Sequence, residues 1–200
     1  MIAELIEAGF EPWLQGRPVR RVLDLCTGGG SIALAMAVHQ PQWKIDAVDL
    51  SPAALSLAAE NLEQQQLGDR VRLIESDLFA ALSGEVYDLL VSNPPYITRA
   101  EYAAMPREYA HEPRLGLESG DDGLDATLRI LRDAPAHLSE NALLIVEVGE
   151  AERALNRLLP ELAFAWIEFG VGQMGIFALE AGELRAGLEA VRRVCTARGL

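Results

Sequence analysis

The chain has little of what a disulfide scaffold, a zinc site or a membrane span needs. Its 200 residues include only two cysteines, Cys26 and Cys195, which lie far apart and lack metal-ligand spacing, as do the three histidines. No apolar run approaches the roughly 18 residues of a membrane-spanning helix, and Glu4 and Glu7 interrupt the first apolar stretch, unlike a signal peptide. The sequence therefore predicts a soluble cytoplasmic protein with no resident metal.

Positive charge is also scarce, since 17 Lys and Arg stand against 30 Asp and Glu and give a formal net charge of −13. A protein that grips nucleic acid by neutralising phosphates usually presents a basic face, so this balance argues against such a grip and favours a basic protein partner. The small basic cluster of Arg17, Arg20 and Arg21 is interpreted as a solvated strand entrance. The apolar content of 50% is enough for one globular domain with a substantial core.

Apolar runs alternate with helical patterns along most of the chain, which is typical of a parallel α/β sheet. The strand-like runs are residues 21–25, 44–48, 70–74, 87–91 and 142–148, and the helical segments lie around residues 31–38, 52–66 and 124–138. Residues 163–169 and 175–179 break the alternation and indicate an antiparallel hairpin with residues 171–174 as its connection. We therefore predict a doubly wound, Rossmann-like sheet of seven strands, mostly parallel, that finishes in a C-terminal antiparallel hairpin.

The domain plan follows from the end of that hairpin. The sheet domain is expected to span residues 1–181, and residues 182–200 are expected to form a C-terminal helical tail. In the tail, apolar side chains recur on one helical face, at Leu184, Leu188, Val191 and Val194. This pattern predicts a helix that packs on the domain. Ser51 and Pro52 mark a helix start, with serine as the cap and proline in the first turn.

The segment Ser92-Asn93-Pro94-Pro95-Tyr96 comes directly after a buried strand-like run, where open α/β sheets bind ligands. Proline has no N–H and keeps its predecessor extended, which leaves the carbonyls of Asn93 and Pro94 free. Two converging carbonyls can each accept one hydrogen of an –NH2 group. Its nitrogen is a poor nucleophile, and such acceptors would favour a localised lone pair in the transition state. An ordinary proline-rich turn is the open alternative.

A glycine-rich loop, Gly28-Gly29-Gly30, follows the first strand-like run and opens a helix, so that the backbone can turn sharply and approach a ligand. With Ala33 in the last place and Asp49 at the spacing of a ribose-binding acid, it also fits the dinucleotide pattern. A nicotinamide dehydrogenase is therefore an alternative. Asp24 argues against it, because a carboxylate before the glycines would repel a pyrophosphate but could accept hydrogen bonds from an ammonium group.

A second acid, Asp77, follows the third strand-like run and could accept a hydrogen bond from an adenine amine while Leu78 or Phe79 flanks the ring. Together with the Asn93 segment, these acids stand at successive strand ends. Singly, each could be a helix cap or a solvated loop charge. As a set they favour a nucleoside-like ligand beside an –NH2 substrate.

With these motifs in order, the sequence resembles the class I S-adenosylmethionine-dependent methyltransferases, and within them the HemK-type protein-glutamine methyltransferases. The resemblance rests on Ser92-Asn93-Pro94-Pro95-Tyr96-Ile97, on His111-Glu112-Pro113, and on Gly120-Asp121-Asp122-Gly123-Leu124-Asp125. Residues 109–117 are similar to the branch that modifies a glutamine of ribosomal protein uL3, whereas the release-factor branch usually has Ala-Leu in place of Gly116-Leu117. The match extends over nearly all of residues 2–179.

The resemblance implies S-adenosyl-L-methionine as cofactor and S-adenosyl-L-homocysteine as product. It assigns cofactor binding to Asp24, Thr27, Gly28, Gly30, Asp49, Leu50, Asp77, Leu78 and Asn93. Among them, Gly28 and Gly30 would form the methionine-side turn, Asp49 would hold the ribose hydroxyls and Asp77 the adenine edge. Asn93, Pro94 and Tyr96 would be the catalytic residues that bind the target amide, and the implied partner is a basic ribosomal protein.

The family usually carries a further N-terminal helical domain that helps to recognise the protein substrate, and this chain begins near the start of its relatives' catalytic domain. Binding of the methyl donor is expected without that N-terminal domain, whereas recognition of the protein substrate is expected to depend on the domain. Three alternatives stay open: a release-factor glutamine methyltransferase, a nucleic-acid base amine N-methyltransferase, and a catalytically silent fragment that binds S-adenosylmethionine. The second shares the Asn/Asp-Pro-Pro-aromatic element because it faces the same –NH2 chemistry.

Overall fold

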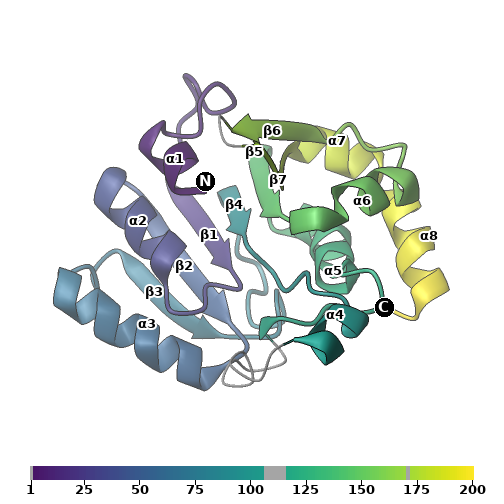
Figure 1. Ribbon diagram of the computed structural model, residues 1–200. Helices are drawn as coiled ribbons and strands as arrows, with labels where there is room; N and C mark the ends of the chain where they lie inside the picture. Colours follow the sequence, from purple (N-terminus) through teal and green to yellow (C-terminus); the bar gives the residue numbers. More distant parts are fainter. Residues whose placement is uncertain (1, 106–115, 170–171) are drawn as a thin grey trace. The chain divides into compact units, whose positions relative to one another are not determined.

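The computed structural model describes residues 2–105, 116–169 and 172–200. The chain forms two compact units: a first unit of Met1–Ser92 with Ala136–Leu144, and a second unit of Asn93–Pro135 with Ile145–Leu200. Hydrogen bonding gives a seven-stranded sheet in the order β3-β2-β1-β4-β5-β7-β6 (Figure 1). The predicted α/β class, mostly parallel with an antiparallel C-terminal pair, is confirmed.

The first unit holds the parallel strands. Its elements are α1 (Ile2–Glu7), β1 (Arg21–Leu25), α2 (Ser31–His39), β2 (Lys44–Asp49), α3 (Pro52–Gln65), β3 (Val71–Glu75), β4 (Tyr87–Ser92) and most of β5 (Leu138–Glu147). β1 pairs in parallel with β2 on one side and β4 on the other, and β2 pairs with β3. α2 and α3 pack along β2 and β3 (Figure 1). Ser51 caps α3 as predicted, because its side chain accepts a hydrogen bond from the Ala54 N–H at 3.3 Å.

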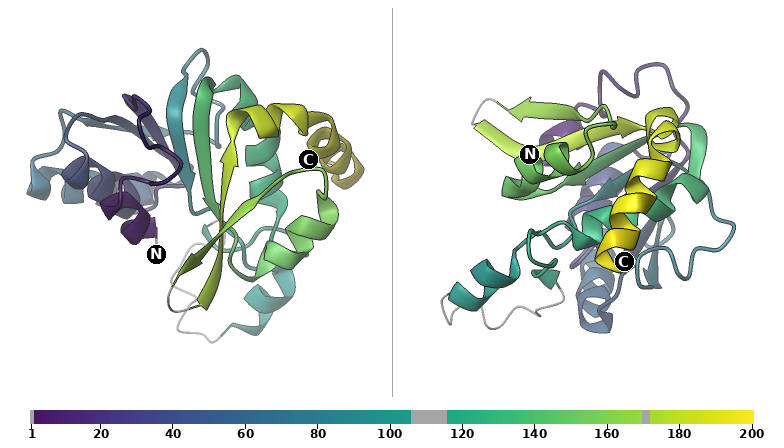
Figure 2. Two further views of the ribbon diagram at one scale, coloured as in Figure 1. Left: turned by 90° about the horizontal axis from the view of Figure 1, so that it is seen from above. Right: turned by 90° about the vertical axis from the view of Figure 1, so that its right-hand side faces the viewer.

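The second unit holds the antiparallel pair and the C-terminal helices. Its elements are α4 (Arg99–Ala104), α5 (Asp125–Asp133), η4 (Gly149–Ala151), α6 (Glu152–Leu158), β6 (Ala165–Phe169), β7 (Gly172–Glu180), α7 (Ala181–Ala186) and α8 (Leu188–Arg198). β6 and β7 run antiparallel, and α8 lies beside α5 (Figure 2). The predicted packing face of the tail is confirmed at Leu184 and Val191, whose side chains are fully buried.

Two regions of the chain differ from the predicted elements by three residues or more. The helical segment placed around residues 124–138 ends at Asp133, and β5 begins at Leu138 after a 3-10 turn over Ala134–Ala136. Pro135 explains this end, since its ring and its missing N–H stop the helical ladder. The hairpin connection expected at residues 171–174 is shorter, because Gly172 already pairs with Phe169. A register shift, typical of a β-bulge, lies between the Trp166 and Glu168 pairs. Residue 171 lies outside the described residues.

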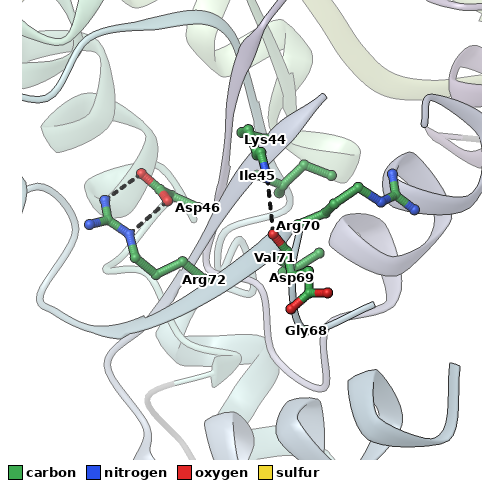
Figure 3. A pocket seen from close by; sticks show the side chains of 8 residues that line it. All are labelled: Lys44, Ile45, Asp46, Gly68, Asp69, Arg70, Val71 and Arg72. Atoms are coloured by element: carbon green, nitrogen blue, oxygen red, sulfur yellow. Dashed lines mark hydrogen bonds and ion pairs between the residues drawn. The ribbon is translucent and has the colours of Figure 1, made fainter. Parts of the chain in front are cut away.

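A buried carboxylate joins the amino-terminal halves of four strands of the first unit. Asp46 on β2 is 7% exposed and accepts hydrogen bonds from Arg21 Nη2 at 2.9 Å, from Arg72 Nη2 at 2.7 Å and from Tyr87 Oη at 2.7 Å. Figure 3 shows the two-pronged Arg72 contact beside a surface pocket of about 340 Å³. The Tyr87 hydroxyl is the most costly of these groups to leave unpaired, because its side chain is fully buried.

We expect Asp46→Ala to lower the free energy of unfolding by about 2–4 kcal/mol, since it leaves the buried Tyr87 hydroxyl without its acceptor. Arg21 and Arg72 lose one carboxylate partner and keep Glu85 as the other. The exposed pair Arg192–Glu189 offers the control, and Glu189→Ala should leave stability unchanged. Urea denaturation of the two variants and the parent chain measures the difference. An Asp46→Ala midpoint equal to that of the parent would show that the network is not structural.

Candidate functional site

The predicted cofactor residues of the first unit gather where its parallel strands end. The carboxyl ends of β1, β2 and β3 lie at one edge of the sheet because the strands run in parallel. β1 lies between β2 and β4, so the chain direction of the crossovers reverses there, which is the switch point at which open α/β sheets bind ligands. Asp24, Asp49 and Asp77 stand on or just after these strand ends, as the sequence predicted.

Asp24 is fully buried and only half satisfied. Its Oδ2 accepts hydrogen bonds from the Thr27 hydroxyl and, at 2.9 Å, from the Ala33 N–H in the first turn of α2. Its Oδ1 is buried without a hydrogen-bond partner among the described residues. Burial raises the pKa of Asp24 to about 7, against the opposing effect of those two hydrogen bonds. A buried acceptor of this kind calls for a donor, and a ligand's ammonium group would supply one.

The glycine loop is held open by the acid at the end of β2. Asp49 accepts the Gly28 N–H on Oδ2 and the Ser51 N–H on Oδ1, both at 2.8 Å. Gly28 has a φ of +55°, and no atom lies within 4 Å of the point where an added Cβ would stand. Gly30 has a φ of +84°, and a Cβ added there would lie 3.1 Å from the Ala58 Cβ. The loop thus needs glycine for its backbone conformation and presents backbone rather than side chains to a ligand.

A residue that contacts the glycine loop from α3 was not identified from the sequence. Asn61 on α3 donates from Nδ2 to the Gly29 carbonyl at 2.9 Å and so fixes the loop from the neighbouring helix. The sequence offered one signal for Asn61. It lies three residues after Ala58 and one before Leu62, the two buried residues of α3, so it falls near the buried face of the helix. Asn61 is therefore a positioning residue for the glycine loop.

The end of β3 combines an exposed acid with a buried apolar pair. Asp77 is exposed, whereas Leu78 and Phe79 are 8% and 7% exposed, and Phe79 stacks on His137 at 4.8 Å between ring centroids. Leu78 has a φ of +50°, a left-handed conformation that a residue other than glycine adopts at a cost. Leu50 after β2 is 46% exposed, which leaves an apolar side chain at the same edge.

Cys26 also has a left-handed backbone, with a φ of +62° directly after β1. Two strained residues, Cys26 and Leu78, thus flank the predicted site, and such strain clusters where a ligand is held. Burial raises the pKa of the Cys26 thiol to about 12, so it stays protonated and is no nucleophile. Among the described residues, no group of three or more His, Cys, Asp or Glu side chains is placed to hold a metal ion.

The predicted acceptor residues belong to the second unit and immediately follow β4. Asn93 is exposed, Pro94 is buried and Tyr96 is partly buried. The Tyr96 hydroxyl donates to Glu147 Oε1 at 3.2 Å, and a Cβ added to Gly123 would come within 2.1 Å of the Tyr96 carbonyl oxygen. Sequence reasoning missed Glu147, and nothing in the local pattern connects it with a tyrosine 51 residues away.

The motif around Gly120 lies against the same segment. The Ile97 N–H donates to the Leu117 carbonyl and the Ile97 carbonyl accepts from the Ser119 N–H, both at 2.9 Å, which makes an isolated bridge. The Arg99 N–H donates to the Gly120 carbonyl at 2.8 Å. Asp122 is held by Arg198 of α8 at 2.6 Å, and this contact lowers the pKa of Asp122. The resemblance carried by residues 109–115, including His111-Glu112-Pro113, lies outside the described residues.

Comparison with solved structures identifies the fold. Similar solved structures include a methyltransferase from Pyrococcus furiosus, with a TM-score of 0.61 and 18% identity over 88% of this chain and 82% of that one. TrmN from Thermus thermophilus is also similar, with a TM-score of 0.61 and 24% identity over 89% of this chain and 47% of that one. At these identities the likeness concerns the fold, which is the fold of the class I methyltransferases.

Sequence comparison narrows the class. Residues 11–109 match the Methyltransferase small domain family model. The ribosomal protein uL3 glutamine methyltransferase of Xanthomonas campestris pv. campestris is 60% identical over 98% of this chain and 64% of its own length, and that of Francisella tularensis subsp. tularensis is 46% identical over 92% and 59%. Over nearly its whole length the chain is similar to these uL3 glutamine methyltransferases, which confirms the predicted resemblance. It spans less than two thirds of the length of these relatives.

None of the helices within residues 2–105, 116–169 and 172–200 is long and apolar enough to cross a bilayer.

Proposed function

We propose that the chain transfers a methyl group from S-adenosyl-L-methionine to the side-chain amide nitrogen (N5) of a glutamine in ribosomal protein uL3. The observation that carries this proposal is the 60% identity over 197 residues to a protein named for that reaction. The net charge of −13 suits a basic ribosomal protein as partner, and a cytoplasmic location belongs to the same proposal.

In this proposal the first unit binds the methyl donor. The sulfonium of S-adenosyl-L-methionine supplies a methyl group that is already activated for transfer, and S-adenosyl-L-homocysteine is the product. Asp24 accepts from the ammonium group through its unpartnered Oδ1, and Asp49 accepts from the ribose hydroxyls through the lone pairs that Gly28 and Ser51 leave free. Asp77 and Leu78 are assigned to the adenine, with Thr27, Gly30 and Leu50 completing the seat.

The segment after β4 binds the target amide. Asn93 Oδ1 and the Pro94 carbonyl each accept one hydrogen of the –NH2 group and so orient the nitrogen lone pair toward the methyl group. Tyr96 packs on the glutamine side chain. The amide nitrogen gives up one of its two protons to water as it gains the methyl group. The residues act by orientation, desolvation and hydrogen bonding, and no covalent enzyme intermediate is needed.

The raised pKa of Asp24 predicts how donor affinity depends on pH. Below about pH 7 the Asp24 carboxyl of the free protein is neutral, whereas a cationic ligand binds the ionised carboxylate. The Kd for S-adenosyl-L-methionine should therefore fall about tenfold for each pH unit as the pH rises to about 7. Above about pH 8 the ligand's own ammonium group loses its proton and affinity declines again. Titration calorimetry from about pH 5.5 to about pH 9 measures this curve.

In Asp24→Asn the acidic limb of that curve should vanish and affinity should be lower at neutral pH. The same raised pKa makes the free fold lose stability as pH rises from about 4 through about 7, because over that range the folded state binds a proton that the unfolded chain has released. A parent curve that is flat across the acidic range would exclude Asp24 as the ammonium acceptor.

The substrate is tested with methyl-labelled S-adenosyl-L-methionine and three purified candidates: uL3, a peptide-chain release factor and 23S-type ribosomal RNA. Label in uL3 supports the proposal. Label in the release factor or in RNA would instead establish one of the two rival substrates. Donor binding without label in any candidate would establish a silent binding module.

A further inference from the structure

The Tyr96 side chain is fixed more tightly than packing on a substrate requires. Its hydroxyl donates to Glu147 Oε1 at 3.2 Å, at the end of β5. Its ring lies against Gly149, where an added Cβ would come within 2.8 Å of Tyr96 Cε2. Its carbonyl abuts Gly123, so both the backbone and the ring have little room to move. The ring therefore holds its hydroxyl at one place and in one direction.

The partner of that hydroxyl determines where its proton points. Burial raises the pKa of the Glu147 carboxyl, and the hydrogen bond from Tyr96 opposes that shift. Once ionised, this carboxylate only accepts hydrogen bonds, so the Tyr96 O–H points to Glu147. Burial and the neighbouring Glu147 raise the pKa of Tyr96, which therefore keeps its proton at neutral pH. With the proton directed to Glu147, the Tyr96 oxygen has only its lone pairs left for any other group.

Only one polarity of substrate suits such an oxygen. A glutamine side chain presents an –NH2 donor where the nearly isosteric glutamate presents acceptor oxygens. Asn93 Oδ1 and the Pro94 carbonyl accept the two hydrogens of the –NH2 group, and the Tyr96 oxygen is a third group that presents lone pairs and no donor to the substrate. A carboxylate placed among them loses its hydration and finds no donor, and mismatches of this kind give large discrimination between isosteres.

We propose that Glu147 is a positioning residue that keeps the Tyr96 hydroxyl proton turned away from the substrate, and that this polarity selects a glutamine amide over a glutamate carboxylate. The inference rests on the proposed function, because it concerns the same acceptor site. It adds a substrate preference and a residue that the resemblance did not supply.

The test compares uL3 with a uL3 variant that has glutamate at the methylated position. Transfer to uL3 gives KM, and inhibition of that transfer by the glutamate variant gives Ki, at about pH 8 where exposed carboxyls are ionised. In the parent chain we expect Ki to exceed KM by about 10²-fold or more. In Glu147→Gln the Ki/KM ratio should fall about tenfold, because the amide of the new side chain lets the Tyr96 hydroxyl reorient.

Two further variants separate polarity from a merely structural role. Tyr96→Phe should lower the ratio to the same degree, and adding Glu147→Gln to it should change nothing more, because both act through one hydroxyl. Glu150→Gln changes an exposed glutamate in η4, three residues after Glu147, and should leave the ratio at the parent value.

The outcomes distinguish this inference from the proposed function. If the parent chain methylates uL3 and Glu147→Gln loses activity with an unchanged Ki/KM ratio, Glu147 is structural and the inference fails alone. If the parent chain methylates neither uL3 nor another glutamine-bearing protein, the proposed function and the inference fail together. A reduced ratio in both Glu147→Gln and Tyr96→Phe supports the inference.

Discussion

Asn93→Ala is expected to lower the rate of methyl transfer by about 10²–10³-fold while the Kd for S-adenosyl-L-methionine stays within about threefold of the parent value. The variant removes one of the two acceptors assigned to the –NH2 group and leaves the donor residues of the first unit untouched. Single-turnover transfer to uL3 gives the rate, and calorimetry gives the donor affinity. The effect should fall on the rate constant, since the lost hydrogen bond matters most when the nitrogen lone pair becomes localised.

Asn141 supplies the matched control for that experiment. Its side chain is also exposed, and it lies on β5 away from the Asn93-Pro94-Pro95-Tyr96 segment in sequence. Asn141→Ala should transfer at the parent rate. Parent-like transfer by Asn93→Ala would instead remove Asn93 from the reaction and leave the Pro94 carbonyl without its proposed companion.

Asp49→Ala is expected to affect donor binding rather than the transfer rate. The Kd for the donor should rise about 10²-fold or more, and at saturating donor the rate of transfer should be largely restored. The carboxylate holds the Gly28 and Ser51 N–H groups at 2.8 Å, so its loss removes the assigned ribose acceptor and loosens the glycine loop together. Hydrogen bonds to a charged group contribute roughly 1.5–3 kcal/mol each, which sets the size of the expected change. Calorimetry with S-adenosyl-L-homocysteine measures it without turnover.

Asp88 offers a close control because it, too, accepts two backbone N–H groups through one carboxylate. Its Oδ2 receives the Arg20 and Arg21 N–H groups at 2.9 and 3.1 Å, at the start of β1 rather than at a carboxyl end. Asp88→Ala should cost stability without changing donor affinity. Equal losses of donor affinity in Asp49→Ala and Asp88→Ala would show that both effects are general loosening of the fold.

Much of the fold follows from local signals in the sequence. The strand over Arg21–Leu25 was predicted with the bounds that the structure has, since its apolar run is buried and ends at a glycine loop. The α3 start at Ser51-Pro52 was predicted from capping chemistry alone. The helix end at Asp133 was missed although Pro135 marks it, because the apolar spacing continues to Leu138 and outweighed the proline in the interpretation.

The site was predicted only as far as strand ends allow. Parallel strands bring Asp24, Asp49 and Asp77 to one edge, so their common location follows from the order of elements. The partner of each side chain does not follow, because it depends on contacts between residues distant in sequence. The Tyr96–Glu147 and Tyr87–Asp46 hydrogen bonds join residues 51 and 41 positions apart, and neither leaves a periodic trace.

The most direct measurement is tandem mass spectrometry of uL3 after reaction with the chain and methyl-labelled S-adenosyl-L-methionine. The account predicts one labelled peptide whose fragments place the methyl group on the side-chain nitrogen of a glutamine, and no such peptide with Asn93→Ala. A methyl group on a lysine amine, a carboxylate or the backbone would contradict the assignment of this site to an amide.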